Sequence, residues 1–105
     1  MDATKEVLKQ AIETYGEERQ LCKAIEELGE LIRAIGRYES TDGSDAEKTE
    51  DGFDKDLDNI AEEIADVRIM LRQLCMIYRI GKRTRLWEEH KIARLAQRLR
   101  HAEQP

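Results

Sequence analysis

Apolar residues recur along this chain at alternating steps of three and four, the spacing that places side chains on one face of an α-helix. Over residues 17–38 these positions are Leu21, Ile25, Leu28, Ile32 and Ile35. Over residues 57–80 they are Leu57, Ile60, Ile64, Val67, Leu71, Leu74 and Tyr78. The pattern predicts two long helices, each with a heptad-like apolar seam.

Two further helices are predicted over residues 3–15 and 83–101, where apolar residues again share one face. Between the long helices, residues 39–56 are acidic and contain glycine, serine and threonine, which is typical of a mobile loop. This loop is either a solvated connection or a lid over a site. We therefore expect residues 1–105 to form one all-α domain, an antiparallel helical hairpin within a four-helix bundle.

The second long helix has more apolar surface than one seam needs. A second stripe contains Ile69, Met70, Met76, Ile77 and Ile80. A helix that is apolar on more than one side is buried on more than one side. A chain of 105 residues cannot supply that cover alone. The sequence therefore predicts a homo-oligomer, either a homodimer or a homotetramer.

Composition narrows the choice of partners. Charged residues make up 39% of the chain and aromatic residues 5%, and the formal net charge is −5. This acidic balance argues against nucleic acid as the main partner. No apolar run is long enough to span a bilayer, and the first residues show no secretory signal. We expect a cytoplasmic protein with no membrane partner, in which Cys22 and Cys75 are reduced, although a disulfide between them is conceivable.

The candidate chemistry lies in two matched acidic motifs. Residues 26–30 read EELGE and residues 62–66 read EEIAD. Glu27 and Glu30 stand three residues apart, as do Glu63 and Asp66, so each pair shares one helix face. In an antiparallel hairpin the two pairs face each other.

Carboxylates crowded in this way repel one another unless protons or cations neutralise them. The alternative is that all four are surface acids. Each pair, however, begins directly before a seam residue, Leu28 or Ile64, and this match between the two helices favours a metal site. No histidine lies near either motif. All-oxygen ligands indicate Mg²⁺, with Mn²⁺ as a second possibility. Magnesium held in this way suggests chemistry on nucleotide phosphates.

The motifs at 26–30 and 63–66, together with KIARLAQRL at 91–99, resemble the MazG-like all-α nucleoside triphosphate pyrophosphohydrolases. The resemblance implies Mg²⁺-dependent hydrolysis of a nucleoside triphosphate to the monophosphate and pyrophosphate. It implies metal ligands at Glu27, Glu30, Glu63 and Asp66, and a catalytic role for Glu26 and Glu27 in placing or deprotonating water. It also implies that substrate phosphates contact Lys23, Lys91 and Arg94.

An alternative of a different class is a helical module without catalysis. Its carboxylates would be solvated or would hold a structural ion, and its role would be oligomerisation or the sensing of nucleotides. Metal-dependent stabilisation distinguishes the enzyme from the non-catalytic module. An enzyme-type site is expected to bind Mg²⁺ or Mn²⁺, and Glu63→Gln is expected to weaken that binding.

Overall fold

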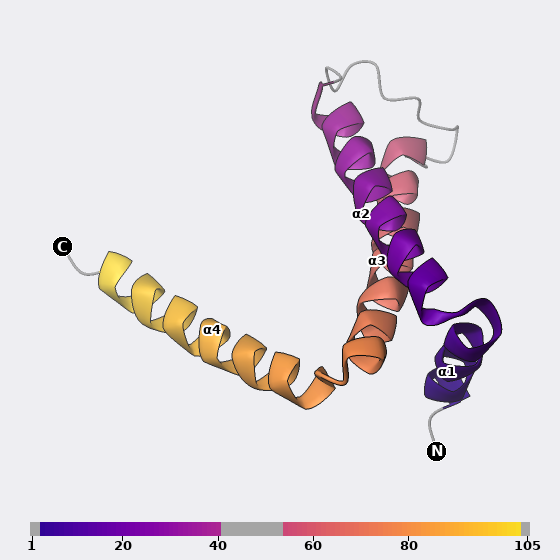
Figure 1. Cartoon of the computed structure of the whole chain (residues 1–105). Helices are drawn as coiled ribbons and strands as arrows, with labels where there is room; N and C mark the ends of the chain where they lie inside the picture. The colour runs from indigo at the N-terminus through magenta and orange to yellow at the C-terminus, as the bar shows by residue number, and fades with distance from the viewer. Residues whose placement is uncertain (1–2, 41–53, 104–105) are drawn as a thin grey trace.

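The computed structural model describes residues 3–40 and 54–103. These residues form four helices, α1 (Ala3–Tyr15), α2 (Glu17–Ser40), α3 (Lys55–Tyr78) and α4 (Gly81–Ala102), and no strand among the described residues (Figure 1). The prediction of an all-α fold is confirmed. The loop was predicted over residues 39–56, but both of its ends are helical, because α2 continues to Ser40 and α3 begins at Lys55. Its remaining residues, 41–53, and the question of a lid lie outside the described residues.

Local signals set the ends of the helices. Asp54 caps α3, its carboxylate accepting hydrogen bonds from the backbone N–H groups of Asp56 (3.0 Å) and Leu57 (3.2 Å). Arg79 ends α3 in the left-handed conformation, with φ of 57°. Helix α4 begins two residues later, at Gly81. Gly16 joins α1 to α2 with φ of 93°, a conformation that glycine adopts without steric cost.

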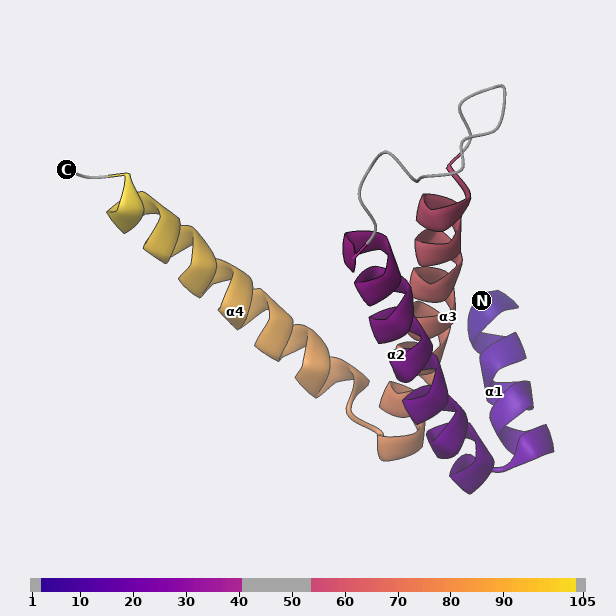
Figure 2. The ribbon, with the colours of Figure 1, turned by 90° about the horizontal axis from the view of Figure 1, so that it is seen from above.

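Helices α2 and α3 form the predicted antiparallel hairpin, and α1 packs against both. Helix α4 contacts α3 and no other helix of the described part of the chain. Figures 1 and 2 show that it extends away from the hairpin in both views. At the α3–α4 corner the Cys75 Sγ and Thr84 Oγ1 atoms lie 3.7 Å apart. Both cysteines are free thiols.

The hairpin packs on a different face of α2 from the one that the apolar seam predicted. The buried residues of α2 are Gln20, Ala24 and Ala34, and those of α3 are Val67, Met70 and Gln73. By contrast, Ile25 and Ile32 of the predicted seam are 72% and 71% exposed. Small alanine side chains let the two helices approach closely, so the aliphatic seam is left on the outside of the chain.

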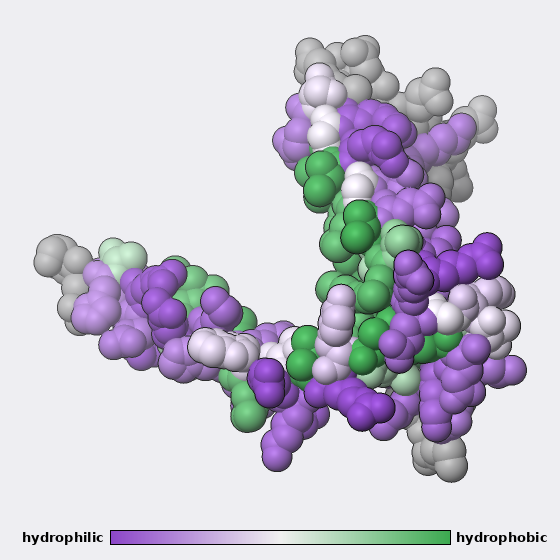
Figure 3. Space-filling model, viewed as in Figure 1, coloured by the Kyte–Doolittle hydropathy of each residue, from purple (hydrophilic) through white to green (hydrophobic). Residues whose placement is uncertain are grey.

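The exposed apolar surface is extensive. Figure 3 shows apolar side chains along the hairpin on the side from which α4 departs. Helix α4 buries none of its residues against the described chain, and its apolar side chains are roughly half exposed: Leu86, Trp87, Ile92, Leu95 and Leu99. Among the described residues, no helix combines the length and apolar character needed to cross a membrane.

Candidate metal centre

Three of the predicted metal-binding carboxylates meet in the hairpin. Glu27 of α2 and Glu63 and Asp66 of α3 each offer an oxygen atom, and these three atoms lie within 4.8 Å of one another. Each residue is half-buried. The spacing of three residues places Glu63 and Asp66 on one face of α3, and the antiparallel packing brings Glu27 opposite them. The site therefore combines acids from both motifs.

Glu63 has one buried carboxylate oxygen. Its Oε2 atom is inaccessible to solvent and has no hydrogen-bond partner in the described part of the chain. Burial, followed by the negative charges of Asp66, Glu27, Glu30 and Glu62, raises the pKa of Glu63. An unpartnered buried carboxylate oxygen is unfavourable unless a proton or a cation satisfies it. The geometry therefore fits a hard cation with oxygen ligands.

The other predicted acids lie around this cluster. The Glu30 carboxylate accepts a hydrogen bond from the Arg33 guanidinium and is not one of the three clustered acids. It remains near enough for its charge to act on Glu63. Glu26, one residue before Glu27, is exposed. Glu30 therefore lies beside the cluster and not within it.

The predicted phosphate-binding residues divide into two groups. The Lys23 Nζ atom lies 3.4 Å from Glu27 Oε1, so this cation stands beside the carboxylates. Lys91 and Arg94 are exposed residues of α4, and α4 makes no close contact with α2 within the described chain. One chain therefore presents Lys23 to the site and keeps the two α4 residues away from it.

Sequence reasoning missed one polar contact in the hairpin. Gln20 Nε2 donates a hydrogen bond of 2.7 Å to Gln73 Oε1, and both side chains are buried. Gln73 does not belong to either apolar stripe and was not singled out. A signal was present nevertheless, because Gln73 follows Asp66 by seven residues, as Glu27 follows Gln20. Residues seven apart share a helix face.

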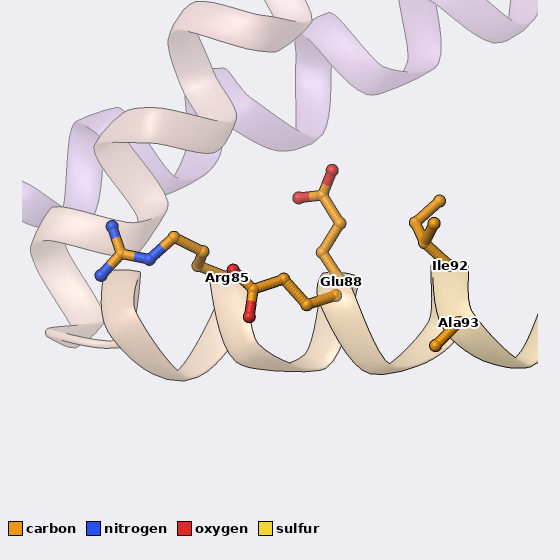
Figure 4. Close-up of a pocket in the computed structure, with 5 residues that line it drawn as sticks. Arg85, Glu88, Ile92 and Ala93 are labelled. Atoms are coloured by element: carbon orange, nitrogen blue, oxygen red, sulfur yellow. The ribbon is translucent and has the colours of Figure 1, made fainter.

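A surface depression of about 470 Å³ lies along α4 (Figure 4). Its lining residues all come from that helix: Arg85, Glu88, Glu89, Ile92 and Ala93. A depression formed by one exposed helix lacks the enclosing walls of a small-molecule site. The carboxylate cluster is therefore the better candidate for chemistry.

Comparison with known families shows the family to which the chain belongs. The model of the MazG nucleotide pyrophosphohydrolase domain matches residues 16–101. The matched range contains α2, α3 and nearly all of α4, and so includes both acidic motifs. No curated protein and no solved structure matches the chain.

Proposed function

Because the chain belongs to the MazG nucleotide pyrophosphohydrolase family, we propose that it hydrolyses nucleoside triphosphates to monophosphates and pyrophosphate in the presence of Mg²⁺. The observation that supports this proposal is the cluster of Glu27, Glu63 and Asp66, with oxygen atoms within 4.8 Å and one buried oxygen that lacks a partner. Mn²⁺ has the same preference for oxygen ligands and is the expected substitute.

Each residue near the cluster has a distinct part in this reaction. Glu27, Glu63 and Asp66 would hold the cation, and Glu30 would join them as a fourth ligand. When bound, the cation offsets phosphate charge and acidifies water. Lys23 binds a phosphate oxygen, and its pairing with Glu27 keeps it at the site. A water oxygen forms a bond to the α-phosphorus, the bond from that phosphorus to the oxygen that bridges it to the β-phosphate breaks, and pyrophosphate leaves with the bridging oxygen.

The proton of the attacking water needs an acceptor. Glu27 lies in the cluster, and a carboxylate oxygen that the cation does not occupy can accept this proton. Glu26 is exposed beside it and orients the water from outside the cluster. The two predicted catalytic residues therefore have different roles: Glu27 accepts the proton, and Glu26 orients the water.

The proposed assembly is a homodimer or a homotetramer. Two observations support it: the exposed aliphatic stripe of α2 formed by Ile25, Leu28, Ile32 and Ile35, and the exposed apolar side of α4. Contiguous apolar surface of this kind marks an interaction site. We propose that a second copy covers α2 with its own α4 and in this way supplies Lys91 and Arg94 to the carboxylates, because the α4 of the same chain does not contact α2. The substrate phosphates are then held by basic residues of both copies.

The deciding experiment measures pyrophosphate and monophosphate released from a panel of ribo- and deoxyribonucleoside triphosphates with Mg²⁺ or Mn²⁺. We expect turnover by the wild type and none by Glu27→Gln. Glu18→Gln is the matched control, because Glu18 is an exposed acid in the first turn of the same helix. Metal binding without turnover on any nucleotide would contradict catalysis and favour a nucleotide-sensing module.

A further inference from the structure

The hydrogen bond between Gln20 and Gln73 lies inside the hairpin. Gln20 is 6% exposed and Gln73 is 3% exposed, and the donor and acceptor atoms are 2.7 Å apart. The other buried residues of α2 and α3 are Ala24, Ala34, Val67 and Met70. Contacts among such residues have no preferred direction, whereas an amide pair is satisfied in one relative position of the helices.

The positions of the two glutamines match those of the acids. Gln20 precedes Glu27 by seven residues, and Gln73 follows Asp66 by seven. In an antiparallel hairpin these equal offsets give the Gln20–Gln73 pair and the Glu27–Asp66 pair the same register. Seven residues correspond to two helical turns, or about 10.5 Å. Any sliding of α2 along α3 that separates the acids therefore also breaks the amide pair.

The acids themselves oppose this register. Glu27, Glu63 and Asp66 carry like charges that repel one another when no cation is bound. The hairpin relieves this repulsion by sliding or opening, unless another contact prevents it. A buried polar pair is suited to that purpose, because a register that separates the two amides leaves them buried and unsatisfied.

We propose that Gln20 and Gln73 are positioning residues that fix the register of α2 against α3 and so hold the three carboxylates ready for the cation. This inference rests on the proposed function, because it takes the cluster to be the metal site. It assigns the pair a role in metal affinity that is separate from its contribution to stability.

The test replaces both glutamines with methionine, which has nearly the same length and no amide. Replacing both partners of a buried hydrogen bond with apolar groups of similar shape changes stability little. We therefore expect Gln20→Met/Gln73→Met to keep a Tm near that of the wild type. Calorimetric titration with Mn²⁺ alone should show affinity reduced by about 10- to 100-fold, the loss seen when residues that orient metal ligands are removed.

The matched control is Gln10→Met/Gln97→Met, because both of these glutamines are exposed, on α1 and α4. This variant should bind Mn²⁺ as the wild type does. Gln20→Met alone leaves the Gln73 amide buried without its partner, so it should lower the Tm as well as the affinity.

Three results would contradict the inference. A double variant that binds Mn²⁺ as tightly as the wild type excludes a positioning role. A Tm loss that parallels the affinity loss assigns the pair to stability alone. A wild type that binds no Mn²⁺ removes the proposed metal site itself, an outcome distinct from the first two because it is seen before any variant is made.

Discussion

At the residue scale, Glu63 combines a buried oxygen with four negatively charged neighbours. This oxygen lacks a hydrogen-bond partner among the described residues, and nearby acids raise the pKa of its carboxyl group further. An apo protein must protonate such a group or tolerate an unpaired charge. At the proposed metal site a bound cation would remove this cost, which would link stability and metal binding at this one side chain.

Glu63→Gln should therefore have opposite effects with and without metal. Near pH 7 and with a chelator present, we expect a higher Tm than that of the wild type, because the amide carries no charge and can donate to Glu27 or Asp66. With saturating Mn²⁺ the wild type should gain about 10 °C or more, while the variant gains little. Differential scanning calorimetry checks both, and an equal metal-induced gain in the two proteins would exclude Glu63 as a ligand.

The raised pKa of Glu63 also fixes the sign of a pH effect. The unfolded chain holds a glutamate at a pKa of about 4.3, and folding raises that pKa. Between the two pKa values the folded state binds more protons, so the free energy of unfolding falls as pH increases. The contribution of Glu63 to the free energy of unfolding is complete below its pKa in the unfolded chain, and it is lost as pH rises through its pKa in the folded protein.

We therefore expect the Tm of the metal-free wild type to decrease more steeply than that of Glu63→Gln as pH rises above about 4.3. Thermal melts of both proteins in chelator-containing buffers measure the difference. Glu18→Gln, which changes an exposed acid, should follow the wild type. Parallel curves for the wild type and Glu63→Gln would contradict the expectation.

At the element scale, periodicity located the helices but not the face on which they pack. Steps of three and four describe the stripe with Ile25 and Ile32 as well as the one with Ala24 and Ala34, because both fit a helix. The sequence-based prediction took the stripe with the larger, more hydrophobic side chains as the packing face. The structure buries the alanines in the hairpin, which suits close packing of two helices and leaves the large side chains exposed.

The same reasoning explains how much of the site was predictable. The matched motifs predicted that Glu27 and Glu30 face Glu63 and Asp66, and the structure brings Glu27, Glu63 and Asp66 together while Glu30 lies beside them against Arg33. The Gln20–Gln73 pair was missed because neither glutamine belongs to an apolar stripe. The direction of α4, and with it the distance of Lys91 and Arg94 from the acids, depends on tertiary packing that periodicity does not describe.

The start of α3 supports one prediction at this scale. The Asp54 carboxylate satisfies two N–H groups of the first turn, which otherwise have no partner within the helix. Asp54→Ala should lower stability by about 1 kcal/mol, or roughly 4–8 °C in Tm. Asp58→Ala is the control, because Asp58 lies in the same turn and takes no part in the cap. Equal Tm losses in both variants would show that charge near the helix end, and not the cap, matters.

At the scale of the whole molecule, the exposed stripe of α2 predicts how the protein assembles. Ile32→Lys places a charge at a side chain that is 71% exposed, so the fold of one chain tolerates it. In the proposed assembly the same charge is buried and unpaired, which should dissociate the oligomer. Light scattering coupled to size-exclusion chromatography measures the mass. Val7→Lys, at an exposed position of α1, should leave the mass unchanged, and an unchanged mass for both variants would contradict the proposed interface.

The isolation of α4 has a consequence for how activity depends on the amount of protein. This helix buries no residue against its own described chain, and most helical stability in proteins comes from packing of an amphipathic face. In the proposed assembly, the folding of α4 and the docking of a second copy would form one equilibrium. If that copy also supplies Lys91 and Arg94, turnover per chain increases with concentration, so dilute protein retains its cation and loses its hydrolysis.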